Sequence, residues 1–205
     1  MKQDSGRFHR FVAVPLKDNL ISLIQDFPGS TAANYILAYG YIDQECGLTL
    51  EVLAAAQKTS DGFRFAETND SIRSFIRIGA VEEDECLDFP DEEEKLAKRN
   101  ADKIELLHYY DASEDVEKTR GMAFLDDCRD KYCVDDVLVC IIRDGLNPEG
   151  CWVRINGLGD QCIMGTLLNE PDQDFGYHAG EQIAFHLLET EDKKIICYSD
   201  LNPGR

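Results

Sequence analysis

Cysteine and histidine are the side chains of this 205-residue chain that could ligate a metal or act as a nucleophile and its base. The eight cysteines contain no C-x2-C spacing, and the closest two, Cys128 and Cys133, lie across an expected helix end. The four histidines form neither an H-x3-H nor an H-E-x-x-H pattern: His9, His108, His178 and His186. Because zinc needs convergent ligands and a reactive thiolate needs a neighbouring base, the sequence predicts no metal, no cofactor and no catalytic residue.

Phosphate and carboxylate chemistry is no easier to assign. The Gly-x-Gly at residues 157–159 is followed by Asp160 and a strand pattern, so it predicts a hairpin turn and not an anion-binding helix start. Forty acidic residues offer too many carboxylate pairs for a general acid and base to be chosen. The residue types therefore favour a non-enzymatic protein and leave an enzyme as the alternative.

The charge of the chain limits its partners. Lys and Arg number 21 against 40 Asp and Glu, which gives a net charge of −19. Binding to nucleic acid or to an anionic membrane needs clustered basic residues, so this balance argues against both. A basic protein is the partner that the charge favours, while the oligomeric state stays open.

Targeting signals are not evident in the sequence. No apolar run follows Met1 as in a secretory signal, and the longest unbroken apolar stretch, residues 137–142, is far shorter than the roughly 20 residues that span a bilayer. We therefore expect a soluble, cytoplasmic protein. Several cysteines lie inside apolar runs, so reduced core cysteines are expected in preference to disulfides.

An acidic block divides the chain. Residues 81–94 hold nine acids, no base and one proline, and a like-charge run of this kind resists packing. The sequence thus predicts a unit over residues 1–80, an acidic linker over 81–103 and a second domain over 104–205. Six acids of the block form a candidate interaction surface, the alternative being a solvated segment without a partner: Glu82, Glu83, Asp84, Glu92, Glu93 and Glu94.

Apolar periodicity places the elements of both units. The first unit begins with a strand over residues 8–14 and a helix over 16–27. The segments 35–42 and 48–56 each fit a helix or a strand, and the first of them favours a strand. Two short segments, 62–66 and 72–78, complete the unit. The second unit contains a helix capped by Ser113 and then five strands at hairpin spacing: 113–131, 134–143, 151–156, 161–168, 182–188 and 194–198. The predicted fold class is α+β, with a mixed α/β unit followed by a helix and a small antiparallel five-stranded β-barrel.

One strand and one loop supply candidate contact residues. Alternation in residues 151–156 turns Val153 and Ile155 toward the core and leaves Trp152 beside Arg154 on the other face. An exposed Trp next to Arg is typical of binding hot spots, unless the helix or the first unit covers it. With the loop that follows Leu168, which also fits plain loop architecture, the candidate interaction or pocket residues are Trp152, Arg154, Asn169, Glu170, Pro171 and His178.

Several motifs of the second half resemble the YegJ-like family of uncharacterised bacterial domains. They are EKTR at 117–120, EGCWVRI at 149–155, GTLLNEP at 165–171 and GEQI at 180–183. The resemblance covers about residues 112–200, and the sequence departs from the family pattern at Gly150 and Cys151 and in a longer loop over 172–179. It implies a small helix-plus-barrel fold in the bacterial cytosol, without established catalytic residues, and relatives that have been proposed as immunity proteins against toxins.

These observations give two hypotheses about function. The first is a non-enzymatic interaction module, of the immunity type, whose acidic surface meets a basic protein. The alternative is a small-molecule-binding or catalytic domain, with its pocket between the two units or at the barrel mouth near Trp152, Asn169, Glu170 and His178. Exposed acids on one face would favour the first, and polar residues converging among apolar ones would favour the second.

Overall fold

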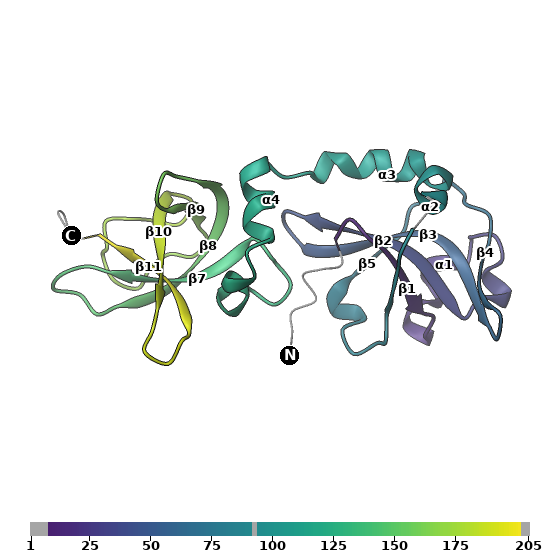
Figure 1. The fold of residues 1–205 in the computed structure, drawn as a ribbon, viewed down its shortest axis with the longest axis horizontal. Coiled ribbons are helices and arrows are strands. Elements are labelled where there is room, and N and C mark those ends of the chain that lie inside the picture. Colours follow the sequence, from purple (N-terminus) through teal and green to yellow (C-terminus); the bar gives the residue numbers. More distant parts are fainter. Residues whose placement is uncertain (1–7, 92–93, 202–205) are drawn as a thin grey trace. The chain divides into compact units, whose positions relative to one another are not determined.

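The computed structural model describes residues 8–91 and 94–201, and the chain divides into two compact units, Met1–Asp111 and Ala112–Arg205 (Figure 1). Both units contain a sheet with short helices, so the α+β class predicted from the sequence is confirmed. Among the described residues, no helix is long and apolar enough to cross a membrane.

The first unit is built on a six-stranded sheet. Its order is β4-β3-β2-β1-β6, β5 also pairs with β3, and all pairs are antiparallel. The strands are β1 (Phe11–Pro15), β2 (Tyr35–Asp43), β3 (Gly47–Thr59), β4 (Gly62–Phe65), β5 (Phe75–Arg77) and β6 (Leu87–Phe89). Most of β2 and the first ten residues of β3 are buried on both faces, so the buried residues of β3 include Thr49 and Glu51 as well as the apolar residues around them.

Short helices accompany this sheet. They are η2 (Asp18–Leu20), α1 (Ile21–Ile24), η3 (Ser30–Ala32), η4 (Ile78–Ala80), α2 (Lys95–Arg99), α3 (Ala101–Leu107) and η5 (His108–Tyr110). The single helix predicted over residues 16–27 is therefore too long, although its apolar residues Leu20, Ile24 and Phe27 are buried as expected. Neither η2 nor α1 begins with a side-chain cap, so the first N–H groups have no side-chain acceptor and only short turns form.

The predicted linker over residues 81–103 is instead part of the first unit. Its strand β6 pairs with β1, and its helices bury Leu96 and the whole length of Lys103. The acidic run packs because buried apolar residues, among them Val81 and Cys86, are interleaved with its carboxylates. The division between the two units therefore lies later in the chain than the charge pattern predicts.

The second unit is a closed five-stranded barrel with the order β10-β11-β7-β8-β9. Its strands match the five predicted segments to within a few residues: β7 (Asp136–Ile142), β8 (Glu149–Leu158), β9 (Ile163–Leu167), β10 (Gln182–Glu189) and β11 (Ile195–Asp200). Four of the pairs are antiparallel as predicted, but β11 closes onto β7 in parallel. The prediction of a wholly antiparallel barrel is wrong at this seam, because a meander with an odd number of strands ends in the direction in which it began.

The helical part of the second unit is shorter than predicted. The segment 113–131 forms α4 (Glu114–Arg120) and η6 (Ala123–Cys128), with Gly121 between them. The predicted cap is confirmed, since Ser113 Oγ accepts a hydrogen bond from the Val116 amide at 3.4 Å. Glycine is a poor helix former, and α4 ends at Arg120, directly before Gly121.

Candidate functional site

A row of exposed apolar side chains crosses the outer surface of the barrel. Trp152 on β8 points outward between the buried Cys151 and Val153, and Leu138 lies directly opposite it on β7. On the other side of Trp152, the Leu168 amide donates a hydrogen bond to the Trp152 carbonyl at 2.8 Å. Three neighbouring segments therefore place three large apolar side chains next to one another.

The row continues across the parallel seam. Cys197 pairs with Val139, so Ile196 lies level with Leu138, and Leu188 of β10 is paired with Ile196. We call these five residues the apolar row: Leu138, Trp152, Leu168, Leu188 and Ile196. Each of these residues is 37 to 49% exposed, and the row runs around the closed barrel because its members lie on β7, β8, β10 and β11 and directly after β9. Neighbouring exposed apolar side chains mark contact surfaces in soluble proteins.

Arg154 lies beside this row but is already bound within the barrel. Its Nε and Nη2 atoms donate to the two carboxylate oxygens of Asp136 at 2.7 and 2.8 Å, across the β7–β8 pair. The hydrogen bonds to Asp136 raise the pKa of the Arg154 guanidinium above its usual value. The sequence predicted correctly that Arg154 turns outward, but its immediate role is to join two strands.

The loop after Leu168 connects the other candidate residues. Asn169 Oδ1 accepts a hydrogen bond from the Trp152 amide at 2.7 Å, and Asn169 Nδ2 donates to the Glu170 carbonyl at 3.4 Å. The Glu170 carboxylate lies 2.7 Å from His178 Nδ1 and accepts a hydrogen bond from the Ala179 amide at 2.9 Å. Pro171 is buried at the start of the loop. The structure thus brings four of the predicted residues into one chain of contacts that shapes the loop.

The His178–Glu170 pair is an exposed ion pair. The hydrogen bond with Glu170 and the charge of that carboxylate raise the pKa of His178. The same hydrogen bond, with that of the Ala179 amide, lowers the pKa of Glu170. Because both side chains are exposed, the pair ties the loop together and gives no sign of a nucleophile or a general base at work.

The predicted acidic surface is only partly present as a set of exposed acids. Glu83 and Glu94 are exposed and Glu82 is half-buried, whereas the Asp84 carboxylate is buried against Lys17. Glu94 pairs with Lys98 at 3.3 Å. The remaining two acids, Glu92 and Glu93, lie outside the described residues.

One cavity lies within the barrel unit. It has a volume of about 480 Å³ and is lined by residues that include Arg143, His186 and Ser199. Arg143 donates to the Phe175 carbonyl at 2.8 Å, Ser199 donates to the Ala184 carbonyl at 2.7 Å, and His186 Nδ1 lies 3.0 Å from the Gln161 carbonyl. These three side chains are therefore already hydrogen-bonded to backbone carbonyls of the barrel unit. Trp152, Asn169, Glu170 and His178 do not line this cavity, and a pocket beside them stays a prediction.

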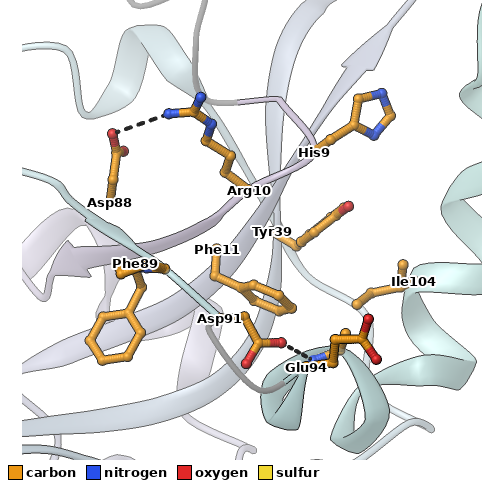
Figure 2. Close-up of a pocket in the computed structure, with 11 residues that line it drawn as sticks. His9, Arg10, Phe11, Tyr39, Asp88, Phe89, Asp91, Glu94 and Ile104 are labelled. Carbon is orange, nitrogen blue, oxygen red and sulfur yellow. Dashed lines mark hydrogen bonds and ion pairs between the residues drawn. The ribbon is translucent and has the colours of Figure 1, made fainter.

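A second cavity, of about 460 Å³, lies within the first unit (Figure 2). Phe11, Tyr39 and Phe89 form its aromatic wall, and Ala97 and Ile104 contribute from α2 and α3. Its charged residues are Arg10, Asp88, Asp91 and Glu94, with His9 beside them. Sequence reasoning missed this site because its residues come from distant parts of the chain, and half of them from the segment interpreted as a linker.

The cysteines are free thiols in the described structure. Four of them are buried, as expected for core residues: Cys86, Cys128, Cys151 and Cys197. A hydrogen bond with Cys197 lowers the pKa of Cys128, while the same contact raises the pKa of Cys197. Within residues 8–91 and 94–201, no group of three or more His, Cys, Asp or Glu is arranged to hold a metal ion.

Comparison of the chain with family models, with curated proteins and with solved structures returned no match. The resemblance to the YegJ-like domains stays a prediction from the motifs of the second half.

Proposed function

We propose that this chain is a non-enzymatic protein-binding module and that its barrel binds a basic protein through the apolar row. The observation that carries the proposal is the run of exposed apolar side chains on neighbouring strands of one barrel, in which Trp152 lies between Leu138 and Leu168. Tryptophan is among the residues that contribute most to protein interfaces.

The backbone under the row favours binding. Trp152 and its neighbours stand on hydrogen-bonded strands, and the Asn169 side chain fixes the Trp152 amide. A surface that is ordered before binding loses little conformational entropy in the complex. Gly150, opposite Cys140, also leaves Leu138 uncovered, since a Cβ atom at Gly150 would lie 3.4 Å from Leu138 Cδ1.

The charge around the row favours a basic partner. Residues 112–205 contain 19 acidic against 9 basic residues, and the acids of residues 81–94 add to the negative field of the chain. Complementary charge speeds association and selects partners, so a basic protein with an apolar contact patch fits best. The resemblance to YegJ-like domains agrees with this proposal, because relatives of that family have been proposed as immunity proteins, and we accordingly propose a cytoplasmic, toxin-neutralising role.

The test compares proteins retained by the full chain and by two variants. Trp152→Ala removes the largest side chain of the row, and Leu106→Ala, an exposed apolar residue of the first unit, is the matched control. We expect a stoichiometric basic protein from the source cell to bind the unaltered chain and the control, and to bind Trp152→Ala at least about tenfold more weakly. Raising the salt from about 0.1 to about 0.5 M should weaken the complex further, because exposed charges are then screened more strongly.

Two results would contradict the proposal. One is a partner whose affinity is the same for Trp152→Ala and Leu106→Ala, which would place the interface elsewhere. The other is a homodimer in light scattering that Trp152→Ala converts to a monomer, since the row would then bind a second copy of this chain.

A further inference from the structure

The cavity of the first unit combines an aromatic wall with an acidic rim, and it is independent of the barrel and of the protein partner proposed above. Its volume of about 460 Å³ lies within the range of pockets that enclose small ligands. Strands β1, β2 and β6 and helices α2 and α3 all contribute residues to it. Figure 2 shows the Phe11 ring between those of Phe89 and Tyr39, with Asp91 and Glu94 close by.

The aromatic wall is held in place by edge-to-face contacts. The ring centroids of Phe11 and Tyr39 are 5.1 Å apart, and Phe89 is fixed by Phe63 at 5.3 Å and by Phe65 at 5.2 Å. The face of an aromatic ring carries partial negative charge and attracts a cation. A wall of three ordered rings therefore offers a surface for an organic cation.

The charged residues at the rim of the cavity also favour a cation. Three carboxylates, those of Asp88, Asp91 and Glu94, line the cavity, and two cations face them: Arg10 lies 4.0 Å from Asp88, and Lys98, outside the lining, pairs with Glu94 at 3.3 Å. Asp91 is oriented by the amides of Leu96 and Ala97, which donate to its two oxygens at 3.0 and 2.8 Å. The excess of negative charge attracts a cation and repels an anion of the same size.

The backbone on both sides of the cavity adopts an unusual conformation. Three described non-glycine residues have positive φ, and two of them, His9 at 55° and Glu94 at 53°, line this cavity. Such conformations persist where the surrounding structure enforces them, and they are concentrated at ligand sites. Glu94 is the N-cap residue of α2, so its backbone conformation fixes the start of that helix at the rim of the cavity.

We infer that the cavity lined by Phe11, Tyr39, Phe89, Asp91 and Glu94 binds an organic cation, an ammonium or guanidinium group carried by an apolar body. The rings contact the body and the charge, and the carboxylates neutralise the charge at the rim. The cation can be a free amine or the side chain of a Lys or Arg in a peptide.

The first experiment titrates the full chain with three aromatic probes of similar size and different charge: benzylammonium, benzyl alcohol and benzoate. Chemical shifts of the first unit are followed by NMR. We expect benzylammonium to bind at least about tenfold more tightly than benzyl alcohol, and benzoate to bind least. Equal binding of benzylammonium and benzyl alcohol, or tighter binding of benzoate, would overturn the inference.

Variants then connect the binding to the named residues. Glu94→Gln should weaken benzylammonium about threefold and leave benzyl alcohol unchanged, whereas Glu105→Gln, an exposed acid on α3 outside the cavity, should change neither. Phe89→Leu keeps an apolar wall and removes a ring, so it should weaken benzylammonium by more than benzyl alcohol. An identical affinity for benzylammonium in Glu94→Gln and Glu105→Gln would contradict the assignment.

A third arm separates the two sources of the cation. A flexible Gly-Ser peptide with one central Arg should compete with benzylammonium if the natural ligand is a protein side chain, and should fail to compete if the cavity takes free amines only; either result supports a cation site. Trp152→Ala should leave benzylammonium binding unchanged, so the outcome here is separate from that of the protein-binding proposal.

Discussion

Individual charged residues take on structural roles that their chemical type does not reveal. The Arg129 side chain is fully buried, where it donates to the carbonyls of Thr119 and Val134. Arg120 reaches Asp135 through two hydrogen bonds, at 2.9 and 2.7 Å. Both guanidiniums join the helical segment to the start of β7, because a buried cation must find acceptors to offset its lost hydration.

A residue-scale prediction concerns the pH dependence of the loop after Leu168. Because Glu170 raises the pKa of His178, the ion pair stabilises the loop fully below the unfolded-state pKa of about 6.5, and this stabilisation is lost as the pH rises through the higher folded-state pKa. The lowered pKa of Glu170 has its effect at acidic pH: the stabilisation that the ion pair gives is lost as the pH falls through the folded-state pKa of this carboxyl.

The measurement is an NMR titration of the His178 ring. We expect a pKa above about 6.5 that returns toward this value in Glu170→Gln. Glu189→Gln, an exposed acid on β10, is the control and should leave the His178 titration unchanged. A His178 pKa that is insensitive to Glu170→Gln would contradict the ion pair.

At the scale of the element, the β8–β9 hairpin depends on a close backbone approach at Gly165. A Cβ atom there would lie 2.4 Å from Val153 Cγ1 and 2.7 Å from the Arg154 carbonyl oxygen. Gly157 in the same hairpin has open space around its Cβ position, so it provides a matched control.

Gly165→Ala should therefore destabilise the barrel, by about 2 kcal/mol, whereas Gly157→Ala should change the free energy of unfolding by only a few tenths. Urea unfolding followed by the fluorescence of Trp152, the single tryptophan of the chain, measures both. Equal stability of the two variants would show that the strands can separate at Gly165 without cost.

The elements also show why parts of the fold could not be predicted. Alternation identified the outward face of β8, because side-chain direction along a strand is local. The helix at 113–131 was overestimated since its apolar spacing continues beyond Gly121, where the chain turns into η6. Lys103 could not be placed from the sequence. Its Nζ donates hydrogen bonds to the carbonyls of Val52 and Ile72 at 3.1 and 2.8 Å, and these partners are distant in the chain, so no local pattern predicts them.

At the scale of the whole molecule, the position of the boundary between the two units is testable. The barrel core consists of residues from Val116 to Cys197, and the first unit needs β6, α2 and α3 to cover its sheet. A compact unit with its own core is expected to fold alone.

We therefore expect fragment 112–205 to unfold cooperatively with the Trp152 fluorescence of the full chain, and fragment 1–111 to fold as well. Fragment 1–80, which ends where the charge pattern placed the boundary, should expose the faces of Leu37 and Leu53 that Leu96 covers and should fail to fold. Circular dichroism with thermal unfolding distinguishes the three. A stable fragment 1–80 would instead support the prediction that residues 81–103 are a linker outside the first unit.

The sequence by itself determined what depends on neighbouring residues: the strands of the barrel, the Ser113 cap and the outward direction of Trp152. Tertiary structure decided everything that depends on pairing between distant segments. The parallel closure of β11 on β7 aligns Ile196 with Leu138, and the packing of α2 and α3 against β1 and β2 creates the aromatic cavity. Register and closure are cooperative properties of the whole sheet, so no local pattern encodes them.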